Sequence, residues 1–394
     1  MRYTGVTARG VITPIFRQGD DIVASITDCV ANAAKRDNFT LGDGDIVGVT
    51  EAVVARAQGN YATCEQIAGD IRAKFGGGAI GVVFPILSRN RFSLLLRAIS
   101  KAAEKVYVQL SFPADEVGNL LMPRETFDSA GVNPFTASFD ETSFRRVFDK
   151  SATVHGFTGV DYIEFYKEIG GNIEIIFSND PVYILKYAKN VLACDIHTRA
   201  RTKRLLAAAG AGIVLGLDDI LTAPFGGSGY NPEFGLLGSN KAGEDKVKLF
   251  PRDCQRFAEE LAAALSKRID RQIEALVYGD GCFKDPVGGI WELADPVVCP
   301  GYTARLAGVP NEIKLKYFAD GDFAHLSGHE LEAAMRERIA AKDGSLVGSM
   351  QAEGTTPRRI RDLVGSLCDL VSGSGDRGTP VVLVQNYFAN YATE

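Results

Sequence analysis

The sequence is organised around a polar run that begins in a glycine-rich turn, Gly238-Ser239-Asn240-Lys241-Ala242-Gly243-Glu244-Asp245. Further on, an apolar segment ends in a carboxylate between two glycines, Ile273-Glu274-Ala275-Leu276-Val277-Tyr278-Gly279-Asp280-Gly281. Glycine lets the backbone and a ligand phosphate come close, and Mg²⁺ or Mn²⁺ prefers carboxylate, carbonyl and water oxygens. We therefore expect Asp245 and Asp280 to converge on a divalent cation beside a nucleotide. The alternative is that both are ordinary turn residues, because Asp and Gly are common in loops.

Apolar periodicity predicts the elements on both sides of this stretch. Strands are predicted at residues 9–16, 45–50, 79–85, 106–110, 173–177, 211–216, 273–278 and 381–385, and helices at 22–35, 92–105, 253–266 and 356–371. The order strand, helix, strand over residues 79–110 is typical of a βαβ unit. A length of 394 residues allows two domains, or one domain with a large insertion.

The composition excludes several classes of protein. The chain is 46% hydrophobic, which is enough for a large core, and its net charge of −6 argues against a general binder of nucleic acid. No apolar run is as long as the roughly 18 residues of a membrane span, and the N-terminal residues lack the apolar stretch of a signal peptide. We therefore expect a cytoplasmic protein with no membrane partner. The seven cysteines show no zinc-binding spacing and are expected to be reduced thiols.

Several separated motifs occur in a fixed order along the chain. They are Gly19-Asp20-Asp21-Ile22, the run Gly44-Asp45-Ile46-Val47-Gly48-Val49-Thr50-Glu51-Ala52-Val53-Val54-Ala55-Arg56-Ala57-Gln58-Gly59, Ala242-Gly243-Glu244-Asp245, Asp280-Gly281 with Pro286, and finally Asp362, Asp369-Leu370-Val371, Gly373 and Pro380-Val381-Val382. In this order they resemble the coenzyme F420-0:L-glutamate ligase family. The resemblance covers about residues 10–60 and 235–385.

The resemblance implies a fold, an activity and an assembly. The fold would be α+β (mixed α/β) in two parts, with mixed sheets and flanking helices. In the implied reaction, GTP or ATP phosphorylates the carboxylate of an acceptor such as coenzyme F420-0, and the amino group of L-glutamate displaces the phosphate. Asp245 and Asp280 take the places of the family's catalytic residues that bind Mg²⁺ or Mn²⁺, and the chain would form a homodimer. A folate-type glutamyl ligase and a non-catalytic nucleotide-binding regulator of the same fold are the alternatives.

Other residues are candidates for binding the nucleotide. Arg56 takes the place of a family lysine and is a candidate for contacting phosphate. Asn240, Gly243 and Gly281 lie in or next to the motifs of the two aspartates. Gly281 replaces a family threonine, and Ser374 stands where a relative has a glutamine near the metal. These departures leave the metal geometry and the choice between GTP and ATP open.

A basic segment stands apart from these motifs. Arg199, Arg201, Lys203 and Arg204 begin a predicted helix, at the end where the macrodipole favours anions rather than cations. Such a group of cations suits phosphate or a carboxylate-rich substrate, and on that ground Arg199 and Arg201 are candidates for ligand binding. A solvated helix face, or ion pairs between subunits, is an equal alternative.

The resemblance also divides the chain. Residues 1–234 form an N-terminal α/β part that includes a βαβ-containing insertion at about 81–171, because the short family members have no counterpart of that stretch. Residues 235–394 form the metal- and nucleotide-binding part. Glu51 and Ala52 replace a serine and a lysine of the family.

Overall fold

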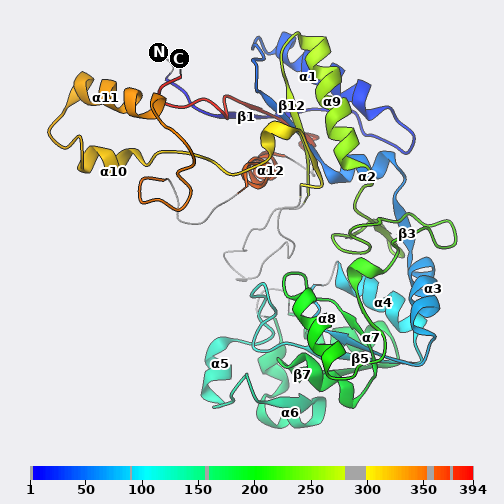
Figure 1. Cartoon of the computed structure of the whole chain (residues 1–394). Helices are drawn as coiled ribbons and strands as arrows, with labels where there is room; N and C mark the ends of the chain where they lie inside the picture. Colours follow the sequence, from blue (N-terminus) through cyan, green and yellow to red (C-terminus); the bar gives the residue numbers. More distant parts are fainter. Residues whose placement is uncertain are drawn as a thin grey trace.

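Three β-sheets with flanking helices make up the described part of the computed structural model, residues 3–88, 91–155, 159–279, 299–352, 359–372 and 376–393. Figure 1 shows two α/β bodies joined by a slender connection at β3. One body holds a five-stranded sheet and the other a six-stranded sheet, while a three-stranded sheet lies at the connection. The predicted mixed α/β fold, with mixed sheets and flanking helices, is confirmed.

The five-stranded sheet unites the two ends of the chain. In spatial order its strands are β1 (Thr7–Val11), β14 (Val381–Gln385), β2 (Ile46–Thr50), β12 (Glu274–Tyr278) and β13 (Gly301–Tyr302). The pair β2 and β12 is parallel and the other pairs are antiparallel. The three central strands are almost continuous apolar runs because helices cover both faces of the sheet.

Alternate residues of these central strands contact different helices. The helices of this body are α1 (Ile22–Arg36), α2 (Glu51–Ala57), α9 (Cys254–Ile269), α10 (Leu315–Asp320), α11 (Gly328–Ala340) and α12 (Ile360–Val371), with the 3₁₀ helix η4 (Ala304–Leu306). Val47 and Val277 share an apolar cluster with α1 and α9. Ile46 and Leu276 share the cluster on the opposite face with α12. The period of two along each strand therefore divides one apolar run between two layers of helices.

The six-stranded sheet forms the second body. In spatial order its strands are β6 (Ser138–Asp140), β7 (Ile173–Ser178), β5 (Lys105–Leu110), β4 (Ala79–Val83), β8 (Asn190–Ala193) and β9 (Val214–Gly216), and every neighbouring pair except β6 with β7 is parallel. The helices are α3 (Cys64–Phe75), α4 (Phe92–Ala102), α5 (Arg124–Ser129), α6 (Glu141–Val147), α7 (Tyr162–Ile169) and α8 (Arg199–Ala208), with the 3₁₀ helices η1 (Lys150–Thr153), η2 (Pro181–Lys186) and η3 (Leu217–Asp219). Apolar clusters place α3, α4 and α7 on one face of the sheet and η2 and α8 on the other.

The sheets group the chain differently from the sequence-based division. The predicted βαβ unit is confirmed, because β4 and β5 are parallel neighbours joined by α4. The inserted body extends past the predicted insertion at 81–171, since the six-stranded sheet runs to residue 216. The pairing of β1 and β2 with β12 and β14 also places both chain ends in one sheet, across the predicted boundary between residues 234 and 235. Pairing between such distant segments leaves no signal in local periodicity.

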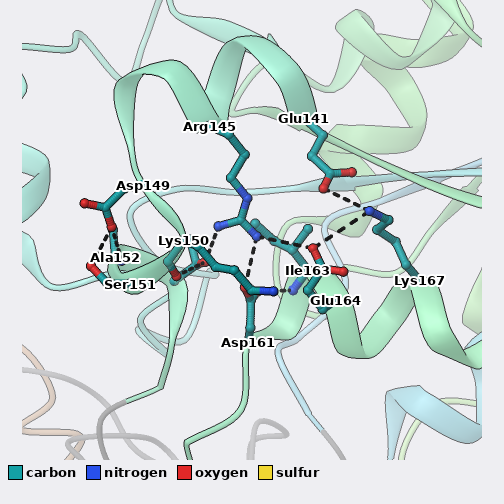
Figure 2. A network of polar contacts seen from close by, with 11 residues as sticks. Glu141, Arg145, Asp149, Lys150, Ser151, Ala152, Asp161, Ile163, Glu164 and Lys167 are labelled. Atoms are coloured by element: carbon teal, nitrogen blue, oxygen red, sulfur yellow. Dashed lines mark hydrogen bonds and ion pairs between the residues drawn. The ribbon is translucent and has the colours of Figure 1, made fainter.

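A charged network connects α6 to α7 in the second body, as Figure 2 shows. Arg145 lies 2.9 Å from the carboxylate of Asp161, and Lys167 lies 2.9 Å from that of Glu141. Asp161 also caps the start of α7, because its carboxylate accepts a hydrogen bond from the backbone N–H of Ile163 at 2.9 Å. Each of these charges is paired, and we assign the network a structural role.

A partly buried carboxylate fixes the connection between β4 and α4. Asp115 accepts hydrogen bonds from the backbone N–H groups of Leu87 at 3.0 Å, Val117 at 3.1 Å and Asn119 at 2.9 Å. Burial opposes ionisation more strongly than these bonds favour it, and it raises the pKa of Asp115 to about 6. The carboxyl group therefore titrates between its usual range and neutral pH.

This pKa predicts how Asp115 affects stability. A raised pKa in the folded state means that the folded chain binds the proton more tightly than the unfolded chain does, so the contribution of Asp115 to stability is highest at acid pH. That contribution should fall as the pH rises from the unfolded pKa to about 6, and then stay constant. At about 1.4 kcal/mol per pKa unit, the loss is at most about 3 kcal/mol. Urea unfolding of the wild type and of Asp115→Asn at pH 4 and pH 7 measures this loss. The free energy of unfolding of the variant, relative to that of the wild type, should be higher at pH 7 than at pH 4. The same difference in free energy at both pH values would contradict the assignment.

Candidate functional site

The predicted metal residue Asp245 lies at the turn of a β-hairpin. The strands β10 (Asn240–Lys241) and β11 (Lys246–Lys248) are antiparallel, and β11 also pairs with β3 (Tyr61–Thr63). A hydrogen bond from the Ala242 N–H to the Lys246 carbonyl, at 2.8 Å, closes the turn. Gly243 and Asp245 are exposed in this turn. The hairpin therefore presents the Asp245 carboxylate on the surface.

Cationic side chains of α4 lie beside this turn. The Arg97 guanidinium donates a hydrogen bond to the carbonyl of Glu244 at 3.1 Å. The pKa of Lys101 is raised, chiefly by its hydrogen bond with Glu65 and further by the negative charge of Asp245. The hairpin and α4 together place one carboxylate close to two cations, an arrangement that suits an anionic ligand bound through a metal.

The thiol of Cys64 is a second neighbour of Asp245. The backbone N–H of Cys64 donates to the Asp245 carbonyl at 3.1 Å, which connects the hairpin to the start of α3. Burial, followed by the hydrogen bond with the Asp245 carboxylate, raises the pKa of the Cys64 thiol to about 12. A thiol that stays protonated at neutral pH is a poor nucleophile. The Cys64 thiol therefore stays protonated beside Asp245 at neutral pH.

A buried ion pair connects the hairpin to the five-stranded sheet. The Lys248 Nζ lies 2.8 Å and 2.7 Å from the two carboxylate oxygens of Glu51, and Glu51 is only 2% exposed. Glu51 is the first residue of α2 and directly follows β2, whereas Lys248 ends β11. Asp245 immediately precedes β11, three residues before Lys248 in the sequence.

The second predicted metal residue follows β12, which is the neighbour of β2 in the five-stranded sheet. The parallel strands β2 and β12 end together, with Thr50 opposite Tyr278. Asp280 follows Tyr278 by two residues in the sequence, but Asp280 and Gly281 lie outside the described residues. The strand β12 thus ends beside the end of β2. Glu51 follows β2 there, and its ion pair with Lys248 connects this place to the hairpin of Asp245.

Comparison with protein families gives a match that spans nearly the whole chain. The family model described as F420-0:Gamma-glutamyl ligase matches residues 10–386. The chain belongs to this family. No curated protein matches the chain. None of the helices in the described ranges is long and apolar enough to cross a membrane.

The structure of this F420-0:gamma-glutamyl ligase family member separates the remaining predicted residues into two groups. Arg56, in the last turn of α2, is exposed, and Asn240 begins the hairpin. Arg199 and Arg201 lie on α8, which packs on the six-stranded sheet. Arg199 has structural partners there, since its Nε lies 2.8 Å from the carboxylate of Asp218 and its Nη1 donates to a backbone carbonyl at 3.0 Å.

The donor chemistry of the hairpin fits a hard divalent cation. Within the described ranges no group of three His, Cys, Asp or Glu side chains lies close enough to hold a metal ion. Mg²⁺ does not need one, because it is usually held by one or two carboxylates together with water and substrate phosphates. Asp245, as an exposed carboxylate, fits this pattern as one protein ligand in the ligase family, and Asp280 remains the predicted second.

Sequence reasoning missed the charged partners of the hairpin. Lys248, Arg97 and Lys101 were not among the predicted residues, and Glu51 was noted only as a departure from the family motif. A carboxylate that directly follows an apolar strand is a signal for a buried charge in need of a cation. Nothing local identifies the cation, because Lys248 is 197 residues from Glu51.

Proposed function

We propose that this chain is a metal- and nucleotide-dependent amide ligase that adds L-glutamate to a carboxylate acceptor such as coenzyme F420-0. The observation that carries the proposal is the family match over residues 10–386, which includes the hairpin of Asp245 and the edge of the five-stranded sheet. The cations beside that hairpin support it, because the reaction brings together a nucleotide and two substrates with carboxylates.

The proposed reaction has two displacement steps. An oxygen of the acceptor carboxylate attacks the γ-phosphorus of GTP or ATP, and the nucleoside diphosphate leaves. The amine of glutamate then attacks the acyl carbon, phosphate leaves with the oxygen of the acceptor, and the nitrogen loses its proton. Holding the amine close to the acyl phosphate is the main demand on the protein, because an acyl phosphate is unstable in water. No protein nucleophile is needed.

Each residue has a part in this proposal. Asp245 and Asp280 would hold Mg²⁺ or Mn²⁺, which neutralises negative charge on the nucleotide oxygens when it is bound. Arg97 and Lys101 would hold anionic oxygens of the nucleotide or the substrates. The positions proposed to contact the nucleotide are Arg56, Asn240, Gly243 and Gly281. Arg201, with Arg199, is proposed for a carboxylate-rich acceptor.

Mass spectrometry tests the reaction directly. With nucleotide, Mg²⁺, L-glutamate and an acceptor labelled with heavy oxygen in its carboxylate, the product should gain one glutamyl unit and the label should appear in phosphate. A panel of coenzyme F420-0 and pterin acids identifies the acceptor and decides between the deazaflavin and folate alternatives. Release of AMP and pyrophosphate would replace the acyl phosphate with an adenylate, and nucleotide binding without turnover on any acceptor would favour the regulator.

We also propose that the chain forms a homodimer. The strand β1 lies at the edge of the five-stranded sheet, and the apolar side chains of Ile12 and Ile15, just after it, are 74% and 79% exposed. Leu370 on α12 is 74% exposed as well. Exposed apolar side chains beside an edge strand suit an interface between two copies of the chain. Light scattering at micromolar concentration should give twice the mass of the chain, and Ile12→Ser with Ile15→Ser should shift it towards the monomer; a monomeric wild type would refute the assembly.

A further inference from the structure

The order of strands in the six-stranded sheet creates a switch point. From β4 the chain adds β5 and then β7 on one side, and it later returns to add β8 and β9 on the other side of β4. The connections that follow β4 and β8 therefore leave the sheet towards opposite sides. In open parallel sheets ligands bind outside the carboxyl ends of the strands at such a point.

A cavity lies at this switch point. It is small, with a volume of about 50 Å³. Its apolar wall comes from the segments after β4 and β8, from α4, from the start of η3 after β9, and from the stretch that leads into the hairpin: Ile86, Phe92, Leu95, Ile196, Leu217 and Leu236.

Two polar side chains interrupt this apolar wall. Arg91, which is half-buried at the start of α4, brings a positive charge to the cavity. Ser239 is 5% exposed, and its hydroxyl has no hydrogen-bond partner among the described residues. Leaving a buried hydroxyl without a hydrogen-bond partner is unfavourable, and a polar atom of a ligand would remove that cost.

The same place is closed to a dinucleotide. The connection from β4 to α4, residues 84–91, contains no glycine, so its backbone does not offer the close approach that a pyrophosphate needs. The N-terminal turn before α8 is already occupied, because the carboxylate of Glu116 accepts hydrogen bonds from the N–H groups of Ile196, His197 and Thr198. The cavity therefore selects an apolar ligand body with one anionic group, not a chain of phosphates.

We propose that the cavity between the ends of β4 and β8 binds a small organic anion with an apolar body, whose charged group lies at Arg91 and Ser239. The ligand site does not rest on the ligase activity proposed above, since binding alone defines it. Ser239 directly precedes β10, so the occupant would lie next to the hairpin that carries Asp245.

Fluorescence titration of the full chain with anilinonaphthalene sulfonate, a naphthalene and a phenyl ring with one sulfonate group, tests the site. We expect one saturable site. Ile196→Trp should weaken binding about tenfold or more, because the larger side chain of this half-buried lining residue takes up space in the cavity. Arg91→Gln should lower the affinity for the anionic probe about tenfold, and it should change the affinity for neutral N-phenylnaphthylamine little.

Two controls keep the result decisive. Phe135→Ser removes a side chain that is 88% exposed in the same body, and it should leave the affinity unchanged. Asp245→Asn should also bind the probe normally, whatever happens to its nucleotide turnover, which separates this inference from the ligase proposal. Circular dichroism verifies the fold, and Leu95→Trp is a second filling variant if Ile196→Trp unfolds. Unchanged binding in a folded filling variant, or binding that disappears in Phe135→Ser, would overturn the site.

Discussion

Replacing Asp245 with asparagine is expected to lower glutamate-dependent nucleotide cleavage about a thousand-fold, because a metal ion contributes several kcal/mol and each 1.4 kcal/mol is worth about tenfold in rate. The fold should survive the change. The Asp245 side chain is exposed, and asparagine retains the backbone carbonyl that accepts the Cys64 N–H. The hydrogen bond between the Cys64 thiol and the Asp245 carboxylate can be made to the amide oxygen of asparagine instead. Phosphate release measured against Mg²⁺ concentration gives the rate of cleavage, and calorimetry gives the affinity for nucleotide.

The matched control is Glu244→Gln, one residue earlier in the same exposed turn. It removes an equal charge next to the site, so its activity should stay close to that of the wild type if coordination, and not general charge, explains the loss in Asp245→Asn. Asp280→Asn should behave like Asp245→Asn. The metal assignment fails if both aspartate variants still bind nucleotide in a fully Mg²⁺-dependent manner.

Replacing Lys248 with methionine should reduce the free energy of unfolding by about 3–5 kcal/mol. The change leaves the Glu51 carboxylate buried next to an apolar chain, without the ammonium group that now contacts both of its oxygens. Removing one partner of a buried pair costs far more than the pair itself contributes, because the remaining charge stays buried without the ammonium group that offset its loss of hydration. Urea unfolding at neutral pH measures the loss.

The double variant Glu51→Met with Lys248→Met separates this explanation from simple loss of packing. Two apolar side chains of similar volume often replace a buried ion pair without loss, so the double variant should recover most of the stability. A double variant as unstable as Lys248→Met alone would show that lost packing of the lysine methylene chain, and not the buried Glu51 charge, causes the loss of stability.

Local features of the sequence predicted individual elements well. The helix α1 begins next to Asp21 as expected, because the carboxylate of Asp21 accepts a hydrogen bond from the N–H of Ala24 at 3.0 Å. The βαβ unit of β4, α4 and β5 followed from periodicity alone. Each of these signals arises within a few residues of the chain.

The arrangement of elements depended on contacts that sequence spacing does not encode. The strands β8 and β9 are only four and three residues long, so the true extent of the inserted body could not be read from apolar runs. The family resemblance located the Asp245 motif, but the sequence did not predict its neighbours. Arg97 and Lys101 reach it from a helix more than 140 residues earlier in the chain.

The small sheet at the connection has a consequence for how such a chain can change in evolution. The inserted body leaves the chain after β3 and returns before β11, and these strands are neighbours, with Thr63 opposite Lys246 (Figure 1). Its entry and exit thus lie one strand spacing apart, about 5 Å. A short reverse turn would span the same gap. An entire α/β body can therefore be gained or lost in one event at this point, without altering the register of any strand in the five-stranded sheet.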